Sequence, residues 1–149
     1  MRRPSLALAL LLPLLAAGCG GGGAQGQDSE SQRACKGARR VIEAYLQALK
    51  SGDCAAAYET LAWNARKALS LEQLKKNYAE HGDFYRHLAE GKVDELHYDD
   101  FRVLAKLVTG DGRNEFVALI PEHAGWKIEE TGRNYADLYH RVFSPPGKP

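Results

Sequence analysis

The sequence predicts an α+β fold in which N-terminal helices pack on a curved antiparallel sheet of about four strands. Apolar side chains recur at helical spacing over residues 37–89 and at alternate positions over 92–130. Glycine-containing segments at 110–112 and 123–125 interrupt the alternating pattern and favour hairpin turns. A sheet with one apolar face needs a cover, and the preceding amphipathic helices can supply it.

Length and charge limit the class of protein. The 149 residues are enough for one domain with a hydrophobic core. The 20 basic and 19 acidic side chains are balanced, so we expect no nucleic-acid partner, which would require a concentrated basic surface. The two basic pairs, Arg39-Arg40 and Lys75-Lys76, are interpreted as solvated helix faces.

The first 18 residues have the organisation of a secretory signal. A positively charged start precedes an apolar run over 6–15, and small residues come directly before Cys19. The run is shorter than the roughly 20 residues of a transmembrane helix and contains Pro13. We therefore expect residues 1–18 to be removed as a signal peptide.

Residues 15–19, Leu-Ala-Ala-Gly-Cys, resemble the bacterial lipobox, which more often has Leu at the position of Ala16. The resemblance implies that diacylglycerol modifies the Cys19 thiol, that the bond before it is cut and that the new amine is acylated. Acyl chains at Cys19 would make the membrane a partner, and the domain would face the periplasm of a bacterial envelope. Gly20 after the anchor implies sorting to the outer membrane. The alternative is an ordinary signal peptide with an incidental cysteine.

Residues 19–34 are predicted to form the lipidated cysteine and a flexible tether. Gly, Gln and Ser dominate this segment, which has no apolar periodicity. Its root-mean-square reach is roughly 20 Å. The α+β domain is predicted over 35–143, and a disordered tail over 144–149.

Short local signals mark where the helices start and stop. Gly52 is suited to a helix C-terminus, Asp53 caps the next helix, and Ser70 with Gln73 forms a capping box. Residues 63–66 are predicted to be irregular. The predicted helices span 37–50, 54–62, 71–81 and 84–89, and Gly82-Asp83 separates the last two of these. A final helix is predicted from about 134 to 142.

The strands are predicted from alternating apolar residues. An edge strand is expected over 92–98, followed by three strands within 101–130. The side chains predicted to face the helices are Phe101, Val103, Ala105 and Leu107, then Phe116, Ala118 and Ile120, and finally Trp126 and Ile128.

Residues 41–53 (VIEAYLQALKSGD) and 56–61 (AAYETL) resemble the opening of the nuclear-transport-factor-2-like superfamily, and residues 125–128 (GWKI) are similar to its last strands. The resemblance covers roughly residues 38–131. It implies the cystatin-like cone shared with ketosteroid isomerases, SnoaL-type cyclases and many small bacterial lipoproteins. Enzymes, binding modules and accessory domains all use this fold, so the resemblance does not fix an activity.

Aromatic side chains on the inward faces predict either a packed core or a ligand pocket between helices and sheet. His97 with Asp99 and Asp100 is a tight cluster of titratable groups, to be interpreted as a turn or as an acid/base pair. The candidate pocket residues are Tyr45, Tyr58, Trp63, Tyr78, His97, Phe101 and Trp126.

Other chemistry finds no support in the residue pattern. The five histidines lack the spacing of a zinc site, and there is no nucleophile elbow or phosphate-binding glycine loop. We expect no metal or cofactor and assign no catalytic residue. A disulfide between Cys35 and Cys54 suits an oxidising compartment, but a helix of about 14 residues would separate them by roughly 20 Å. The bond requires that the segment before Gly37 fold back along the helix.

Three functions remain open at this stage. The first is a membrane-anchored binding or accessory module for a small apolar ligand or an envelope protein. The second is a small isomerase, dehydratase or cyclase that uses the cavity, with His97, Asp99 or a tyrosine as the reacting group. The third is a structural partner domain with an exposed apolar patch. An open pocket with a carboxylate at its base would favour the enzyme.

Overall fold

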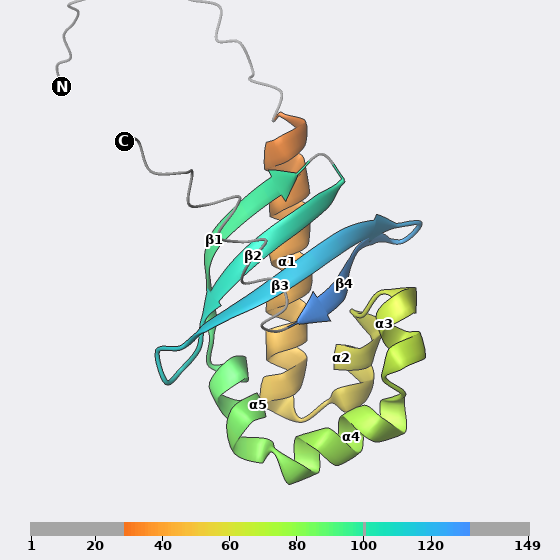
Figure 1. The fold of residues 1–149 in the computed structure, drawn as a ribbon, viewed down its shortest axis with the longest axis vertical. Helices are drawn as coiled ribbons and strands as arrows, with labels where there is room; N and C mark the ends of the chain where they lie inside the picture. The colour runs from red at the N-terminus through yellow and green to blue at the C-terminus, as the bar shows by residue number, and fades with distance from the viewer. Residues whose placement is uncertain (1–28, 100, 132–149) are drawn as a thin grey trace, which may run out of the picture.

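A computed structural model describes residues 29–99 and 101–131, and it confirms the predicted α+β class. In this part of the chain, helices precede a four-stranded antiparallel sheet of order β1-β2-β3-β4. Helix α1 runs along one face of the sheet, and α2 to α5 gather at the end where α1 finishes (Figure 1). The elements are α1 (Glu30–Ser51), α2 (Cys54–Glu59), α3 (Trp63–Ala68), α4 (Leu71–Glu80), α5 (Gly82–Ala89), β1 (Lys92–Asp99), β2 (Arg102–Val108), β3 (Asn114–Glu122) and β4 (Gly125–Thr131).

Helix α1 begins earlier than predicted and ends where predicted. Its first residue is Glu30 rather than Gly37, so residues 30–34, predicted as tether, are helical. The missed signal is a capping box in which Ser29 Oγ accepts from Gln32 N at 3.2 Å and Gln32 Oε1 accepts from Ser29 N at 2.8 Å. Gly52, at φ 72°, supplies the left-handed residue after the helix.

The segment after α1 contains one helix more than predicted. Asp53 caps α2 as expected, its carboxylate accepting from Ala56 N at 2.9 Å. Helix α2 ends at Glu59 rather than at residue 62, and residues 63–66, predicted to be irregular, lie in α3. The backbone N–H of Trp63 donates to Glu122 Oε1 on β3 at 2.8 Å. The partner that completes the start of α3 is therefore distant in sequence.

The Ser70 capping box is expected to stabilise α4 measurably. Ser70 Oγ accepts from Gln73 N at 3.2 Å, and Gln73 Oε1 accepts from Ser70 N at 2.9 Å. We expect Ser70→Ala to lower the free energy of unfolding by about 1 kcal/mol, measured by urea denaturation. Ser51→Ala is the matched control, because the Ser51 hydroxyl donates to Ala48 O at the end of α1 and caps no helix start. Equal losses in the two variants would contradict the capping role.

The face of the sheet that packs on the helices is predicted correctly for β2 and β4 but not for β3. Its buried residues on β2 and β3 are Val103, Ala105, Leu107, Val117 and Leu119, joined by Ile128 on β4. The register pairs Ala105 with Val117 and Val103 with Leu119, and paired residues share a face of the sheet. The opposite face of β3 therefore carries the residues that were predicted to face the helices, Phe116, Ala118 and Ile120. Residues 116–120 are apolar throughout, so alternation does not choose a face.

Phe101, predicted as the first inward residue of β2, is instead 56% exposed just before that strand. Trp126 faces α1 as predicted, and its ring lies so close to Gly37 that a Cβ there would be 2.7 Å from Trp126 Cδ1. A glycine at this position of α1 therefore allows β4 to approach the helix. On the outer face, Leu104 and Ala118 pair and are buried as well.

The edge of β4 is joined to the segment between α2 and α3. Leu61 forms an isolated parallel bridge with Ile128. Ala62 N donates to Ile128 O at 2.7 Å, and Ile128 N donates to Thr60 O at 2.9 Å. These bonds fix the position of α2 and α3 relative to the sheet.

Several predictions concern residues outside the described part of the chain. They are the signal peptide over 1–18, Cys19 and the tether before Ser29, Asp100, the last helix near 134–142 and the tail over 144–149. Within the described part, no helix combines the length and the apolar character needed to cross a bilayer. Cys35 and Cys54 are both free thiols.

Candidate functional site

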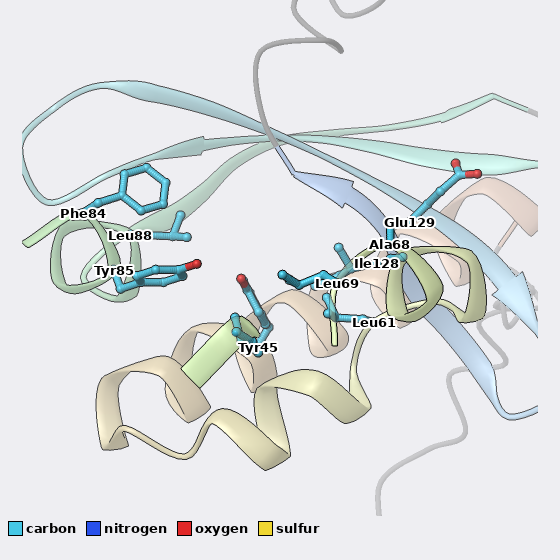
Figure 2. Close-up of a pocket in the computed structure, with 11 residues that line it drawn as sticks. Tyr45, Leu61, Ala68, Leu69, Phe84, Tyr85, Leu88, Ile128 and Glu129 are labelled. Atoms are coloured by element: carbon cyan, nitrogen blue, oxygen red, sulfur yellow. The ribbon is translucent and has the colours of Figure 1, made fainter. Parts of the chain in front are cut away.

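A cavity of about 220 Å³ lies between the second half of α1, helices α3, α4 and α5, and strand β4 (Figure 2). Most of its lining is aliphatic or aromatic, which suits a small apolar molecule. The residues that line it are Tyr45, Leu61, Ala65, Ala68, Leu69, Leu74, Phe84, Tyr85, Leu88, Ile128 and Glu129.

Two tyrosine hydroxyls provide polar groups inside the cavity. The hydroxyls of Tyr45, from α1, and Tyr85, from α5, point toward one another (Figure 2). Burial is the main cause that raises the pKa of both phenols above the ordinary value, and their mutual repulsion adds to the rise for Tyr45. Both hydroxyls therefore stay protonated at neutral pH and can donate hydrogen bonds.

The two hydroxyls differ in their partners. Tyr85 hydrogen-bonds the side chain of Asn77 on α4, which acts against the rise of its pKa. Tyr45 is only 5% exposed as a residue, but its hydroxyl is not among the fully buried polar atoms that lack a partner. Because Tyr45 lines the cavity, its hydroxyl can donate a hydrogen bond to a molecule that enters.

One carboxylate lines the cavity, but it is not at the base. Glu129 on β4 accepts a hydrogen bond from Asn64 Nδ2 at 3.0 Å through its Oε1. Figure 2 shows its carboxylate turned away from Tyr45. The arrangement hypothesised for an enzyme, a carboxylate at the base of the pocket, is not formed by the described residues that line it.

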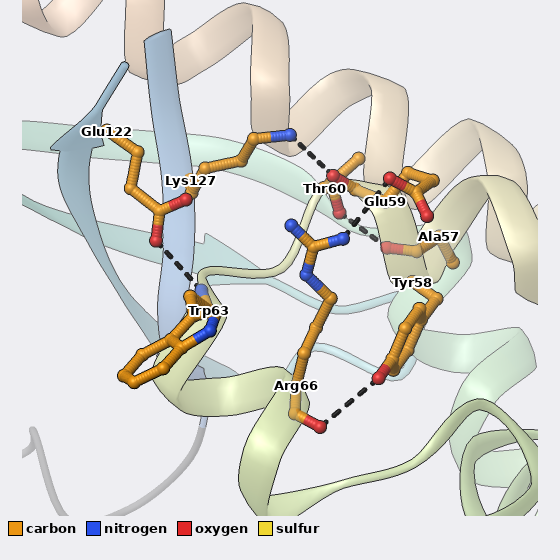
Figure 3. A network of polar contacts seen from close by, with 8 residues as sticks. All are labelled: Ala57, Tyr58, Glu59, Thr60, Trp63, Arg66, Glu122 and Lys127. Atoms are coloured by element: carbon orange, nitrogen blue, oxygen red, sulfur yellow. Dashed lines mark hydrogen bonds and ion pairs between the residues drawn. The ribbon is translucent and has the colours of Figure 1, made fainter. Parts of the chain in front are cut away.

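A polar network holds α3 over one side of the cavity (Figure 3). Besides the bond from Trp63 N to Glu122, Lys127 Nζ donates to Glu59 O at 2.6 Å. Arg66 Nη1 forms an ion pair with Glu59 Oε2 at 3.2 Å. Because these contacts join α2, α3, β3 and β4, they fix the position of α3, whose Ala65 and Ala68 line the cavity.

The predicted pocket tyrosines have different roles. Of the three, Tyr45 alone lines the cavity. The hydroxyl of Tyr58 donates to Arg66 O at 3.1 Å and joins α2 to α3. The hydroxyl of Tyr78 donates to Leu49 O at 2.9 Å and joins α4 to the end of α1.

The other predicted pocket residues lie outside the cavity. Trp63 is 61% exposed, with Lys67 Nζ at 3.5 Å from its ring centroid. His97 pairs with Leu104, on the face of the sheet opposite the helices, so His97 does not reach the cavity. Phe101 and Trp126 line a shallow hollow near the start of α1.

Sequence reasoning missed most of the cavity lining. Tyr85 and Leu88 lie three residues apart in the predicted turn over 84–89, which is the spacing of one helix face. This spacing indicates a helix face, but the predicted segment over 84–89 has only six residues, which is too short to define an apolar stripe. Leu69 has no such signal, because it lies between α3 and α4 and its position depends on how both helices pack.

The described residues offer no metal site and no disulfide. No group of three or more His, Cys, Asp or Glu side chains in this part of the chain is arranged to hold a metal ion. Cys54 is buried in α2, and Cys35 is half-buried in α1, where burial raises its thiol pKa. The Cys35 thiol therefore lacks the lowered pKa that a reactive nucleophile needs.

Comparison with known proteins assigns no family. A scan against protein-family models and a search of curated proteins each found no match for this chain. The resemblance to the nuclear-transport-factor-2-like superfamily therefore remains a proposal. Function has to be argued from the cavity itself.

Proposed function

We propose that this protein is a lipid-anchored, periplasm-facing binding module that holds a small, uncharged, largely apolar ligand. The single observation that carries the proposal is the mostly apolar cavity into which the protonated hydroxyl of Tyr45 points. An apolar pocket with a few convergent polar groups is the common form of a ligand site. The resemblance to a superfamily with many small lipoproteins supports the same proposal.

The cavity limits the ligand by size and charge. An apolar protein cavity of about 150 Å³ binds benzene. The volume of about 220 Å³ therefore suits one ring or a short acyl chain rather than a fused ring system. No lysine or arginine is among the lining residues, so an anion would lose its hydration without a counter-charge. A neutral ligand with one hydrogen-bond acceptor would satisfy Tyr45.

Binding rather than catalysis is proposed because the cavity lacks a positioned proton acceptor among its lining residues. Glu129 faces away from Tyr45, and His97 lies on the other face of the sheet. General acid–base catalysis requires such a group within hydrogen-bond reach of the reacting proton. The donor at Tyr45 can orient a ligand without transforming it.

The lipid anchor is proposed from the Leu-Ala-Ala-Gly-Cys motif at residues 15–19. Diacylglycerol on Cys19 and an acyl group on its amine would hold the domain at the periplasmic face of a bacterial membrane. A ligand or an envelope protein would then meet the domain at this surface.

The binding proposal is tested with two probes of similar size, acetophenone and ethylbenzene. We expect both to shift the NMR signals of the Leu69 and Leu88 methyl groups in the full chain. Tyr45→Phe is expected to weaken acetophenone binding about fivefold and to leave ethylbenzene within about twofold, because one hydrogen bond of about 1 kcal/mol is lost.

Tyr78→Phe is the matched control for this experiment. It removes a hydroxyl that bonds Leu49 O and does not line the cavity, so binding of both probes should be unchanged. If neither probe shifts the cavity methyl groups at millimolar concentration, the binding proposal fails. If the two variants weaken acetophenone binding equally, Tyr45 does not hydrogen-bond the ligand.

A further inference from the structure

The end of the domain at which α1 begins carries a cluster of aromatic side chains. Phe101 is 56% exposed, next to a shallow hollow that Tyr98, Trp126 and Arg33 also line. Figure 1 shows the end of β1 and the start of β2 beside the first turns of α1. An exposed phenylalanine is unfavourable in water, and the described residues leave more than half of Phe101 uncovered.

Contacts with α1 fix this cluster in place. The Tyr98 hydroxyl donates to Glu30 Oε1, in the first turn of α1, at 3.0 Å. The rings of Tyr98 and Trp126 meet edge to face with 6.2 Å between their centroids. The aromatic cluster therefore keeps one orientation relative to the start of the helix.

The chemical composition of this end matches a lipid–water interface. Tyrosine and tryptophan favour that region because their rings are amphipathic, and arginine can keep its charge in water while its stem contacts apolar groups. The guanidinium of Arg102 lies 4.4 Å from the centroid of the Phe101 ring. A phenylalanine flanked by such a group can enter the headgroup region without burying a charge.

The position of the anchor brings this end of the domain to the membrane. Only ten residues, Gly20 to Ser29, separate Cys19 from the first residue of α1. Even if fully extended, ten residues span at most about 35 Å. The cavity lies farther away, because Tyr45 is about 22 Å along α1 from Glu30.

We propose that the α1-start end of the domain lies on the lipid headgroups, with Phe101 inserted, and that the cavity lies at a distance from the membrane. The inference rests on the lipid anchor at Cys19, which belongs to the proposed function. It adds a second, weaker membrane contact that orients the domain. The ligand then enters from the aqueous periplasm rather than from the bilayer.

The two tryptophans of the chain can be replaced, so that a single new tryptophan reports on either end of the domain. One reporter combines Trp63→Phe, Trp126→Phe and Phe101→Trp. The other combines Trp63→Phe, Trp126→Phe and Phe84→Trp. Phe84 is 41% exposed and lies on α5, at the end of the domain away from the start of α1 (Figure 1). Both reporters are made as the full lipidated chain in phosphatidylcholine vesicles whose acyl chains carry bromine, a quencher of tryptophan fluorescence.

We expect the tryptophan at position 101 to lose at least half of its fluorescence relative to vesicles without bromine, and the tryptophan at position 84 to lose less than a tenth. Trp63→Phe and Trp126→Phe are common to both reporters, so their effects on packing cancel. Equal quenching, or stronger quenching at position 84, would overturn the orientation while leaving the anchor intact. Failure of the wild-type chain to sediment with the vesicles would overturn the anchor, and this inference with it.

Discussion

Replacing Cys19 with Ala is expected to move the protein from the membrane fraction to the soluble fraction almost completely. The lipobox resemblance at residues 15–19 implies two or more acyl chains at this position. Burial of each methylene contributes about 0.8 kcal/mol, so two chains give stable anchoring, whereas the aromatic end of the domain alone does not. Cell fractionation measures the change, and labelling with radioactive palmitate checks the modification.

Cys35→Ala is the control for the anchor. Its thiol lies half-buried on α1 within the folded domain, so this variant should stay in the membrane fraction and keep its label. Retention of Cys19→Ala in the membrane after a high-salt wash would show that another part of the chain anchors the protein.

Leu119→Ala is expected to cause the largest loss of stability among the substitutions considered, about 2–5 kcal/mol. Leu119 has no exposed surface and lies in the middle of the sheet, facing α1. Truncation loses the transfer free energy of the side chain and leaves a cavity that rigid neighbours on β2 and β4 cannot fill. The midpoint of urea denaturation, at unchanged slope, measures the loss.

Ile120→Ala tests the assignment of faces in the same strand. Ile120 is half-buried on the opposite face of β3, and we expect its truncation to cost less than half as much as that of Leu119. A larger loss at Ile120 than at Leu119 would mean that the register of β3 is wrong.

The features predicted from sequence are those set by neighbouring residues. Gly52, Asp53 and Ser70 act within three or four positions of the helix ends that they mark, and all three were assigned correctly. Helix α3 was missed because its first N–H group is satisfied by Glu122, which is 59 positions away. Such a contact exists only after the sheet has formed.

The face of β3 and the cavity lining depend on tertiary packing in the same way. Residues 116–120 are apolar on both faces, so the strand pattern alone does not say which face meets the helices. Tyr45 was found because it belongs to a long amphipathic helix with a clear stripe. Its partner Tyr85 is on an eight-residue helix, and only the packing of α5 against α1 brings the two hydroxyls together.

The bridge between Leu61 and Ile128 has a consequence for how copies of this protein meet. A bare strand edge offers free N–H and C=O groups to which a neighbouring molecule can add a strand. At the middle of β4 these groups already bond Thr60 and Ala62. Copies concentrated on a membrane surface would therefore find this edge closed to strand exchange. The opposite edge, β1, has a bulge after Val93 and exposed acidic residues, which also oppose aggregation.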